Sequence, residues 1–327
     1  MTLYPATEPL EHGMLAVGDA QEIYWEVCGS PAGKPAVVLH GGPGSGASPG
    51  WRRFFDPERY RVVLFDQRGA GRSTPSVQDP VTDLSVNTTA HLIGDLEALR
   101  EHLGIERWLV LGGSWGATLG LSYAVQHPER VSEIVLFAVT TTRRADIDYV
   151  TRGVGRYFPE AFARLAAGVP QNEREGDLTA AYARLLASPD PTVRAQAAAD
   201  WCRWEDAIVA LEEDPAPDPR YADPGFRYGF ARLVTHYFSH AAFQDDDAIV
   251  GHLDQLHGIP GVLVHGRLDL AGPADTAWRI AQSWRDARLV IVGGAGHAGA
   301  PAMNEAVVAA TDRFAGSPSG GESVGDR

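Results

Sequence analysis

Short apolar runs recur along the chain and alternate with longer segments in which apolar residues are spaced three or four apart. The runs are rich in β-branched residues and are bounded by glycines or polar loops, which is typical of strands buried on both faces of a sheet. They lie at residues 36–39, 62–65, 108–111, 134–137, 262–265 and 289–292. Between them, a helix over 87–103 is predicted by leucines at helical spacing. This alternation predicts an α/β protein with a mostly parallel sheet covered by helices on both faces.

Two regions depart from the alternation. Residues 12–28 form β-rich runs around the turn-like Gly18-Asp19, which predicts an antiparallel hairpin at the edge of the sheet. No four-residue aliphatic run occurs from about 140 to 255, where helices are predicted at 177–187, 190–211 and 226–240. We therefore expect a core made of residues 1–139 and 256–315 with a helical cap, 140–255, inserted between them. The Gly/Ser-rich tail, 316–327, is expected to be disordered.

Composition narrows the class of protein. The chain has 327 residues, of which 44% are hydrophobic, and a net charge of -14, which argues against a nucleic acid or an anionic membrane as the main partner. Cys28 and Cys202, the two cysteines, are predicted to be small buried hydrophobes in a reducing compartment. The N-terminus does not resemble a signal peptide, and no apolar run approaches the roughly 20 residues that span a bilayer. We expect a cytoplasmic protein.

The segment Gly112-Gly113-Ser114-Trp115-Gly116 joins a predicted strand to a predicted helix. A serine in such a strained turn leaves no room for side chains two positions before and after it, which explains the outer glycines. It also lies at a helix N-terminus, where developing negative charge is favoured. By itself G-x-S-x-G is only moderately specific, and an ordinary glycine-rich turn is the competing interpretation.

A serine nucleophile requires a histidine base and an acid that fixes the histidine's tautomer. Of eleven histidines, His297 is favoured because it follows the last predicted strand in a glycine-rich loop. Asp269 follows the preceding strand, and Asp275 is its competitor, although it is expected to belong to the next helix. For the oxyanion we expect the backbone amides of Trp115 and Gly42. The glycine-rich loops lack a P-loop ending and metal-ligand spacing is absent, so no cofactor or metal is expected.

Three loop motifs together closely resemble the proline iminopeptidases, a serine peptidase family with the α/β-hydrolase fold. The motifs are His40-Gly-Gly-Pro-Gly-Ser-Gly46, Asp66-Gln-Arg-Gly-Ala-Gly-Arg-Ser73 and Gly112-Gly-Ser-Trp-Gly116. The resemblance runs from about residue 8 to 315 and is weakest between about 140 and 200. It implies release of an N-terminal amino acid, typically proline, through an acyl-enzyme, with Ser114, Asp269 and His297 as the triad. It also implies a cap whose carboxylates hold the free ammonium of the substrate.

One of these cap carboxylates carries over to this chain. Trp204-Glu205 matches the family's segment in which a glutamate follows a tryptophan, although a surface glutamate paired with an arginine is the competing interpretation. The second does not carry over, because Val234 stands where family members typically have a glutamate. The lost counter-charge should cost several kcal/mol of ammonium binding unless another group replaces it.

The sequence thus predicts a serine aminopeptidase or amide hydrolase that releases proline or a small residue such as alanine from a peptide or aminoacyl amide. Because Val234 replaces a charged residue, we also consider a substrate whose leaving part is larger and more apolar than a peptide. Such a substrate would suit a biosynthetic amide hydrolase of secondary metabolism. Two alternatives stay open: a carboxylesterase or lactonase with the same triad, and a non-catalytic ligand receptor on the same fold. The expected partner is a small substrate with a free amino terminus, not nucleic acid or membrane.

Overall fold

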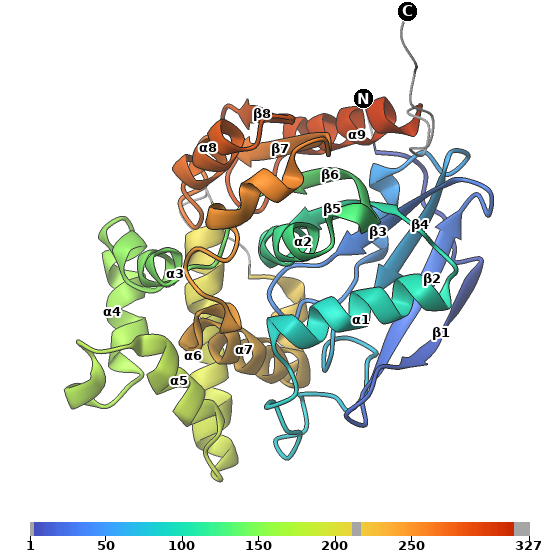
Figure 1. Ribbon diagram of the computed structural model, residues 1–327. Coiled ribbons are helices and arrows are strands. Elements are labelled where there is room, and N and C mark those ends of the chain that lie inside the picture. Colours follow the sequence, from blue (N-terminus) through green and yellow to red (C-terminus); the bar gives the residue numbers. More distant parts are fainter. Residues whose placement is uncertain (1–2, 211–216, 317–327) are drawn as a thin grey trace, which may run out of the picture.

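A twisted sheet forms the centre of the protein, seen in a computed structural model that describes residues 3–210 and 217–316 (Figure 1). Over those residues the sheet has eight strands in the order β1-β2-β4-β3-β5-β6-β7-β8. β1 and β2 form an antiparallel hairpin, β2 pairs antiparallel to β4, and all other neighbours are parallel. The strands are β1 (Glu11–Ala16), β2 (Glu22–Gly29), β3 (Lys34–Leu39), β4 (Tyr60–Phe65), β5 (Trp108–Gly113), β6 (Val131–Phe137), β7 (Gly261–Gly266) and β8 (Ala287–Val292).

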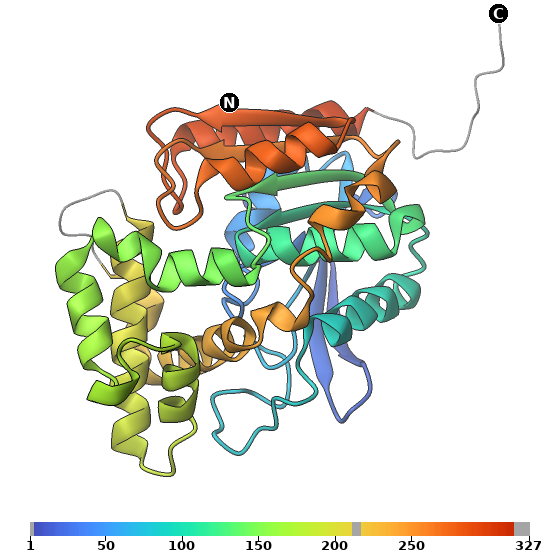
Figure 2. The same ribbon diagram turned by 60° about the vertical axis from the view of Figure 1, so that its left-hand side comes forward.

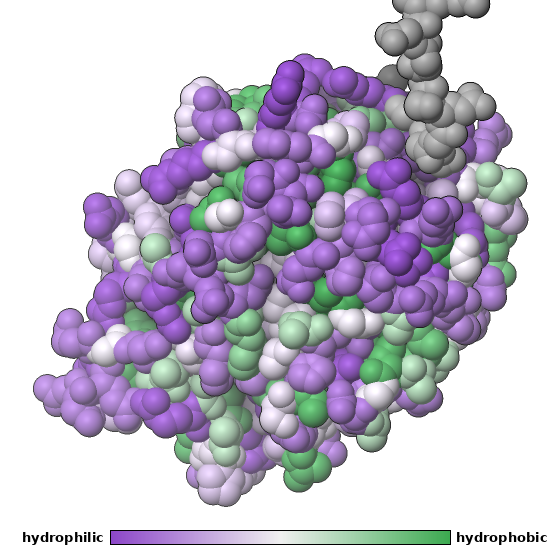
Figure 3. Space-filling view, in the orientation of Figure 1, coloured by the Kyte–Doolittle hydropathy of each residue, from purple (hydrophilic) through white to green (hydrophobic). Residues whose placement is uncertain are grey.

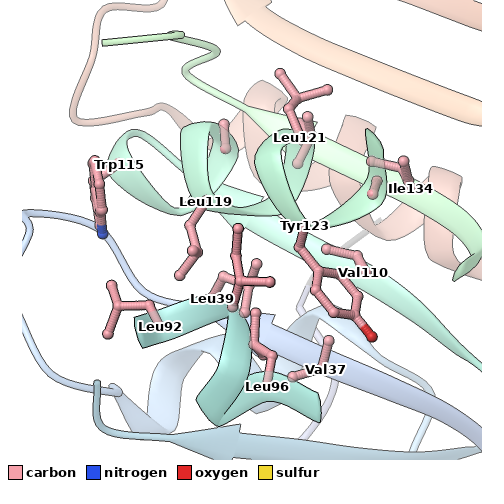
Figure 4. Close-up of a cluster of buried hydrophobic side chains, with 14 of the residues drawn as sticks. Val37, Leu39, Leu92, Leu96, Val110, Trp115, Leu119, Leu121, Tyr123 and Ile134 are labelled. Carbon is pink, nitrogen blue, oxygen red and sulfur yellow. The ribbon is translucent and has the colours of Figure 1, made fainter. Parts of the chain in front are cut away.

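The predicted edge hairpin and the six predicted buried strands are confirmed, and each buried run is longer than expected by two or three residues. Alternate residues of these strands point to opposite faces, as the period of two requires. Val37 and Leu39 belong to an apolar cluster that includes residues of α1 (Thr89–His102), α2 (Trp115–Gln126) and α8 (Ala274–Ser283), and Figure 4 shows part of it. Ala36 and Val38 belong to a second cluster, on the other face, that includes residues of α9 (Pro301–Ala315). The prediction of a sheet covered on both faces is therefore confirmed.

Helices α3 to α7 lie between β6 and β7 in the sequence and form a separate layer (Figures 1 and 2). Their buried side chains make a third apolar cluster of their own. Their bounds are α3 (Arg144–Thr151), α4 (Pro159–Ala167), α5 (Leu178–Leu186), α6 (Pro191–Val209) and α7 (Pro224–Ser239). The three predicted helices correspond to α5, α6 and α7. Asp177 and Asp190 cap α5 and α6 by accepting hydrogen bonds from backbone amides of the first turn.

Sequence patterning missed α3 and α4, which are short helices with few buried positions. The division of the chain at residues 140 and 255 stays a prediction, with all five helices inside those limits. The predicted tail falls, apart from Gly316, outside the described residues. We call the inserted layer α3–α7 the cap.

The face shown in Figure 3 is mostly hydrophilic, with apolar residues scattered over it. Within residues 3–210 and 217–316, no helix has both the length and the apolar character needed to cross a membrane. Cys28 and Cys202 are both buried, as predicted, with unpaired thiols. Burial raises the pKa of the Cys28 thiol to about 11, so this side chain behaves as a small apolar group.

Candidate active site

Ser114 lies between β5 and α2, at the carboxyl edge of the sheet, in a strained backbone conformation. Its φ is 55° and its ψ is -124°, outside the regions that L-residues ordinarily occupy. A Cβ at Gly112 would lie 2.2 Å from the carbonyl oxygen of Gly116, and a Cβ at Gly116 would lie 2.0 Å from that of Leu39. The sequence-based explanation of the two outer glycines is therefore confirmed. The tight turn needs bare backbone on both sides of the serine.

Replacing Gly116 by alanine is expected to lower the free energy of unfolding by about 3 kcal/mol or more, because the contacted atoms are backbone and cannot rotate away. Gly94→Ala is the matched control. Gly94 lies within α1, and a Cβ there would meet no atom within 4 Å, so this substitution should stabilise the protein by about 0.5–1 kcal/mol. Urea unfolding of both variants measures the difference. Equal stabilities would contradict the steric account of the turn.

Three side chains from three separate loops meet at this turn. His297 Nε2 lies 3.0 Å from Ser114 Oγ, and His297 Nδ1 lies 2.9 Å from Asp269 Oδ2. Asp269 follows β7 and is 3% exposed, and the backbone amide of Gly272 also donates to its carboxylate. Because an ionised carboxylate only accepts, His297 carries its proton on Nδ1 and presents Nε2 to the serine hydroxyl. The competing acid, Asp275, lies on α8 and pairs with Arg279.

The electrostatics of the pair favour a charged Asp269. Burial alone would raise the pKa of Asp269, but the charge of His297 and its hydrogen bond outweigh burial and hold that pKa below its ordinary value. For His297, burial lowers the pKa, and the attraction of Asp269 more than reverses this effect, so the pKa is raised. His297 is thus a stronger base than an isolated histidine, as the acceptor of a serine proton needs to be.

His265 is a buried neighbour of this pair. It lies in β7, with Nε2 3.6 Å from Asp269 Oδ2. Its Nδ1 accepts the amide of Val139, and its Nε2 donates to the carbonyl of Gly272. Burial lowers the pKa of His265, which keeps the ring neutral. The ring therefore braces the loop that carries Asp269.

The loop after β3 approaches Ser114 with its backbone. Gly42 has φ of 112°, and a Cβ there would lie 2.6 Å from the nitrogen of Gly44, so this position requires glycine. Trp115 is the first residue of α2, where a backbone amide has no acceptor in a preceding helical turn. Both residues line the cavity that contains Ser114. The two residues whose amides are predicted to stabilise an oxyanion thus line the same cavity as Ser114.

A buried hydrogen-bond chain ties these loops together. His40 Nε2 accepts the amide of Gln67, the side chain of Gln67 donates to the carbonyl of His40, and the indole of Trp115 donates to Gln67 Oε1. His40 and Gln67 therefore hold the two loops together through backbone and side-chain hydrogen bonds. Asp66 holds the next loop by accepting the amides of Ala47 and Arg72. Two of the three loop motifs thus act by holding backbone in place.

Two cavities, of about 370 and 680 Å³, meet above Ser114. Both are lined by Gly42, Ser114, Glu205, Val209 and His297. The smaller, which we call the first cavity, extends between α3 and the loop after β7 and includes Tyr149 and Phe238. The larger, the second cavity, extends between the loop after β3 and the residues that follow α6.

Glu205 on α6 reaches the junction of the two cavities. Its Oε1 accepts the indole N–H of Trp201 at 3.0 Å, and no lysine or arginine of the described residues forms an ion pair with it. The competing interpretation, a surface glutamate paired with an arginine, is therefore wrong. Burial raises the pKa of Glu205 to about 7, and the charge of His297 partly opposes that rise. An unpaired carboxylate thus faces the space above the serine.

The other two predicted cap residues do not line either cavity. Trp204 packs in the cap core, where its indole donates to the carbonyl of Val150. Val234 on α7 is fully buried in the same cluster. We therefore assign both to cap packing rather than to direct substrate contact, because their side chains are buried in the apolar cluster and line neither cavity. Sequence reasoning missed Tyr149, Phe238 and Asp206 as cavity residues, and no motif marks them.

No three histidine, cysteine, aspartate or glutamate side chains of the described residues are grouped so that they could hold a metal ion. The residues around Ser114 are instead a hydroxyl, an imidazole and carboxylates. Their arrangement provides a nucleophile, a base and an acid, which are the groups that acyl transfer requires.

Comparisons with known proteins agree with this chemistry. A family model described as "alpha/beta hydrolase fold" matches residues 34–300. A protein of Streptomyces coelicolor named "Probable proline iminopeptidase" is 55% identical over 319 residues, which cover 96% of this chain and 98% of that protein. The "Proline iminopeptidase" of Xylella fastidiosa (strain Temecula1) is 45% identical over 316 residues, which cover 96% of this chain and 99% of that protein. A solved structure of a proline iminopeptidase-related protein from Thermus thermophilus is 25% identical, with a TM-score of 0.56 and coverage of 93% and 97%.

Proposed function

This chain belongs to the proline iminopeptidase family of α/β-hydrolases, and from that premise we propose that it releases a single N-terminal residue, proline or a small residue such as alanine. The protein is a serine hydrolase of aminopeptidase type. The observation that carries the choice of substrate is Glu205, a carboxylate without a cationic partner in the described structure, at the junction of the cavities above Ser114. A free ammonium group is the natural partner of such a carboxylate.

In the proposed reaction, Ser114 Oγ attacks the carbonyl carbon of the first residue while His297 Nε2 takes the hydroxyl proton. The oxyanion that forms accepts hydrogen bonds from the amides of Gly42 and Trp115. His297 then gives its proton to the leaving nitrogen, the C–N bond breaks, and an acyl-enzyme remains on Ser114. A water molecule then attacks the acyl carbon of the ester while His297 Nε2 takes its proton. His297 gives that proton to Ser114 Oγ as the ester C–O bond breaks, which frees the amino acid and restores the serine.

Asp269 keeps the proton of His297 on Nδ1 throughout and stabilises the imidazolium that forms. Glu205 fixes the substrate's ammonium, and with it the carbonyl carbon two bonds away, over Ser114. Only one residue is released because the ammonium must lie next to the scissile carbonyl to reach this carboxylate. Val234 is apolar and buried in the cap core, so in this proposal it supplies no second counter-charge for the ammonium.

The p-nitroanilides of proline, alanine and N-acetylproline test this proposal. We expect kcat/KM for the acetylated substrate to be lower by about 100-fold or more, because acetylation removes the charge that Glu205 pairs with. Equal turnover of the acetylated and free substrates would exclude a role for the free amine. Efficient cleavage of p-nitrophenyl esters with negligible cleavage of any anilide would favour the carboxylesterase alternative instead.

A further inference from the structure

The second cavity combines aromatic walls with acidic groups. On the core side, the rings of Trp51, Phe54 and Phe137 pack together, with centroids 5.1 Å apart for Trp51 and Phe137 and 5.8 Å apart for Phe54 and Phe137. On the cap side, the rings of Tyr221 and Phe230 lie 5.4 Å apart. These five aromatic side chains, three from the core and two from the cap, line one cavity. A long apolar group would fit between them.

The charges of this cavity do not cancel. Arg220 is held by Asp218, with contacts as short as 2.6 Å, and also donates to the carbonyl of Ser45, so these two side chains neutralise each other. Asp206 also lines the cavity, and its Oδ1 accepts the backbone amide of Asp218 at 3.0 Å. No cationic side chain of the described residues pairs with Asp206. Burial raises the pKa of its carboxyl group, the hydrogen bond from the Asp218 amide partly opposes that rise, and the charge of Asp218 adds to it. The cavity therefore carries an uncompensated negative charge.

The relative sizes of the two cavities indicate which part of a substrate each one takes. The bond that Ser114 cleaves must span their junction, with the acyl residue on one side and the leaving part on the other. The first cavity is the smaller, about 370 Å³, and is lined by Trp115, whose amide we assign to the oxyanion. An aminopeptidase needs space for one residue on the acyl side and a larger, open space for the rest of the peptide. The second cavity, of about 680 Å³, fits the leaving part.

We propose that the second cavity binds the residue that follows the scissile bond and that Asp206 makes it select a long side chain with a cationic end, lysine or arginine. The methylene stem would lie along the aromatic walls, and the charged end would reach Asp206. A glutamate at the same position would face an unpaired carboxylate. This inference rests on the proposed aminopeptidase function and extends it to the second residue of the substrate.

Prolyl dipeptide amides that differ only in the second residue test the proposal. We expect kcat/KM to be about fivefold or more higher for Pro-Lys-NH2 than for Pro-norleucine-NH2, which lacks the terminal ammonium, and for Pro-Lys(acetyl)-NH2, and lowest for Pro-Glu-NH2. The preference for lysine should shrink as salt is added, because the interaction is between charges. In Asp206→Asn the ratio of lysine to norleucine should fall to near 1, because the charge is lost while the amide oxygen still accepts the bond from the Asp218 backbone.

Asp200→Asn is the control for the loss of a charge from the same helix. Asp200 on α6 pairs with Arg203 and lines neither cavity, so the ratio should stay at the wild-type value. A lysine-to-norleucine ratio near 1 in the wild-type enzyme would overturn the inference while leaving the aminopeptidase function intact. An Asp206→Asn effect of equal size on all substrates would also overturn it, because Asp206 would then act on the common ammonium. Failure to release proline from any of them would instead contradict the proposed function itself.

Discussion

Replacement of Ser114 by alanine is expected to lower kcat/KM for proline p-nitroanilide by about 10⁵-fold or more, which is the scale of loss when a triad nucleophile is removed. The variant should fold normally. The hydroxyl is hydrogen-bonded to His297, and alanine has the same Cβ as serine in the strained backbone of the turn. Stopped assays with highly purified protein measure the residual rate, and circular dichroism checks the fold.

His297→Ala should cost about as much as Ser114→Ala, and the double variant should be no worse than either, because residues that act as a unit lose activity together. Ser122→Ala is the matched control. Ser122 lies buried in α2 and bonds to Thr118 and Gln244, away from both cavities. It should keep near wild-type turnover. A Ser114→Ala variant with more than about 1% of the wild-type rate would refute the proposed nucleophile.

Replacement of Glu205 by glutamine is expected to lower kcat/KM for proline p-nitroanilide by about 100- to 1,000-fold, because the substrate's ammonium loses its only assigned counter-charge. Glutamine keeps the length of the side chain and an oxygen that accepts the Trp201 bond. Hydrolysis of p-nitrophenyl acetate, which has no ammonium, should change by no more than a few-fold. If both substrates lose activity equally, Glu205 supports the structure of the site and does not recognise the amine.

The same variant has an expected effect on stability that depends on pH. Burial raises the pKa of Glu205 from 4.5 to about 7, so the folded protein holds this proton over a pH range in which the unfolded chain has released it. The stability that the group contributes is complete below pH 4.5 and is lost as pH rises through 7. At pH 8, Glu205→Gln should therefore be more stable than the wild type, by about 3 kcal/mol at most, and the gain should vanish near pH 4.5. Melting temperatures across this range measure it.

The local parts of the site were predictable from the sequence because they depend on neighbours in the chain. The apolar run 108–111 and the glycines around Ser114 define a strand, a turn and a helix without reference to the rest of the protein. His297 and Asp269 were predicted because parallel strands place the loops after them at one edge of the sheet. The choice of Asp269 over Asp275 followed from where a helix was expected to begin, and α8 does include Asp275.

The cap was harder because its contacts join segments far apart in the chain. Trp204 and Glu205 are adjacent in sequence, yet the helix turns one into the apolar cluster and the other toward Ser114. Asp206 carries no motif, and its importance depends on Arg220 being neutralised by Asp218, a pairing that only the fold reveals. Position 234, where family members typically have a glutamate, is a valine here. The sequence could not show that Asp206 lines the second cavity.

The cap is a single insertion between β6 and β7, so the residues of the cap and those of the sheet loops can change separately during evolution. The residues proposed for bond cleavage, Ser114, Asp269 and His297, all lie on loops of the sheet, whereas Glu205 and Asp206 lie on one cap helix. Mutations in the cap can change which peptides are processed while the cleavage machinery is inherited intact. Related proteins can therefore diverge in the peptides that they cleave while they keep the same catalytic residues.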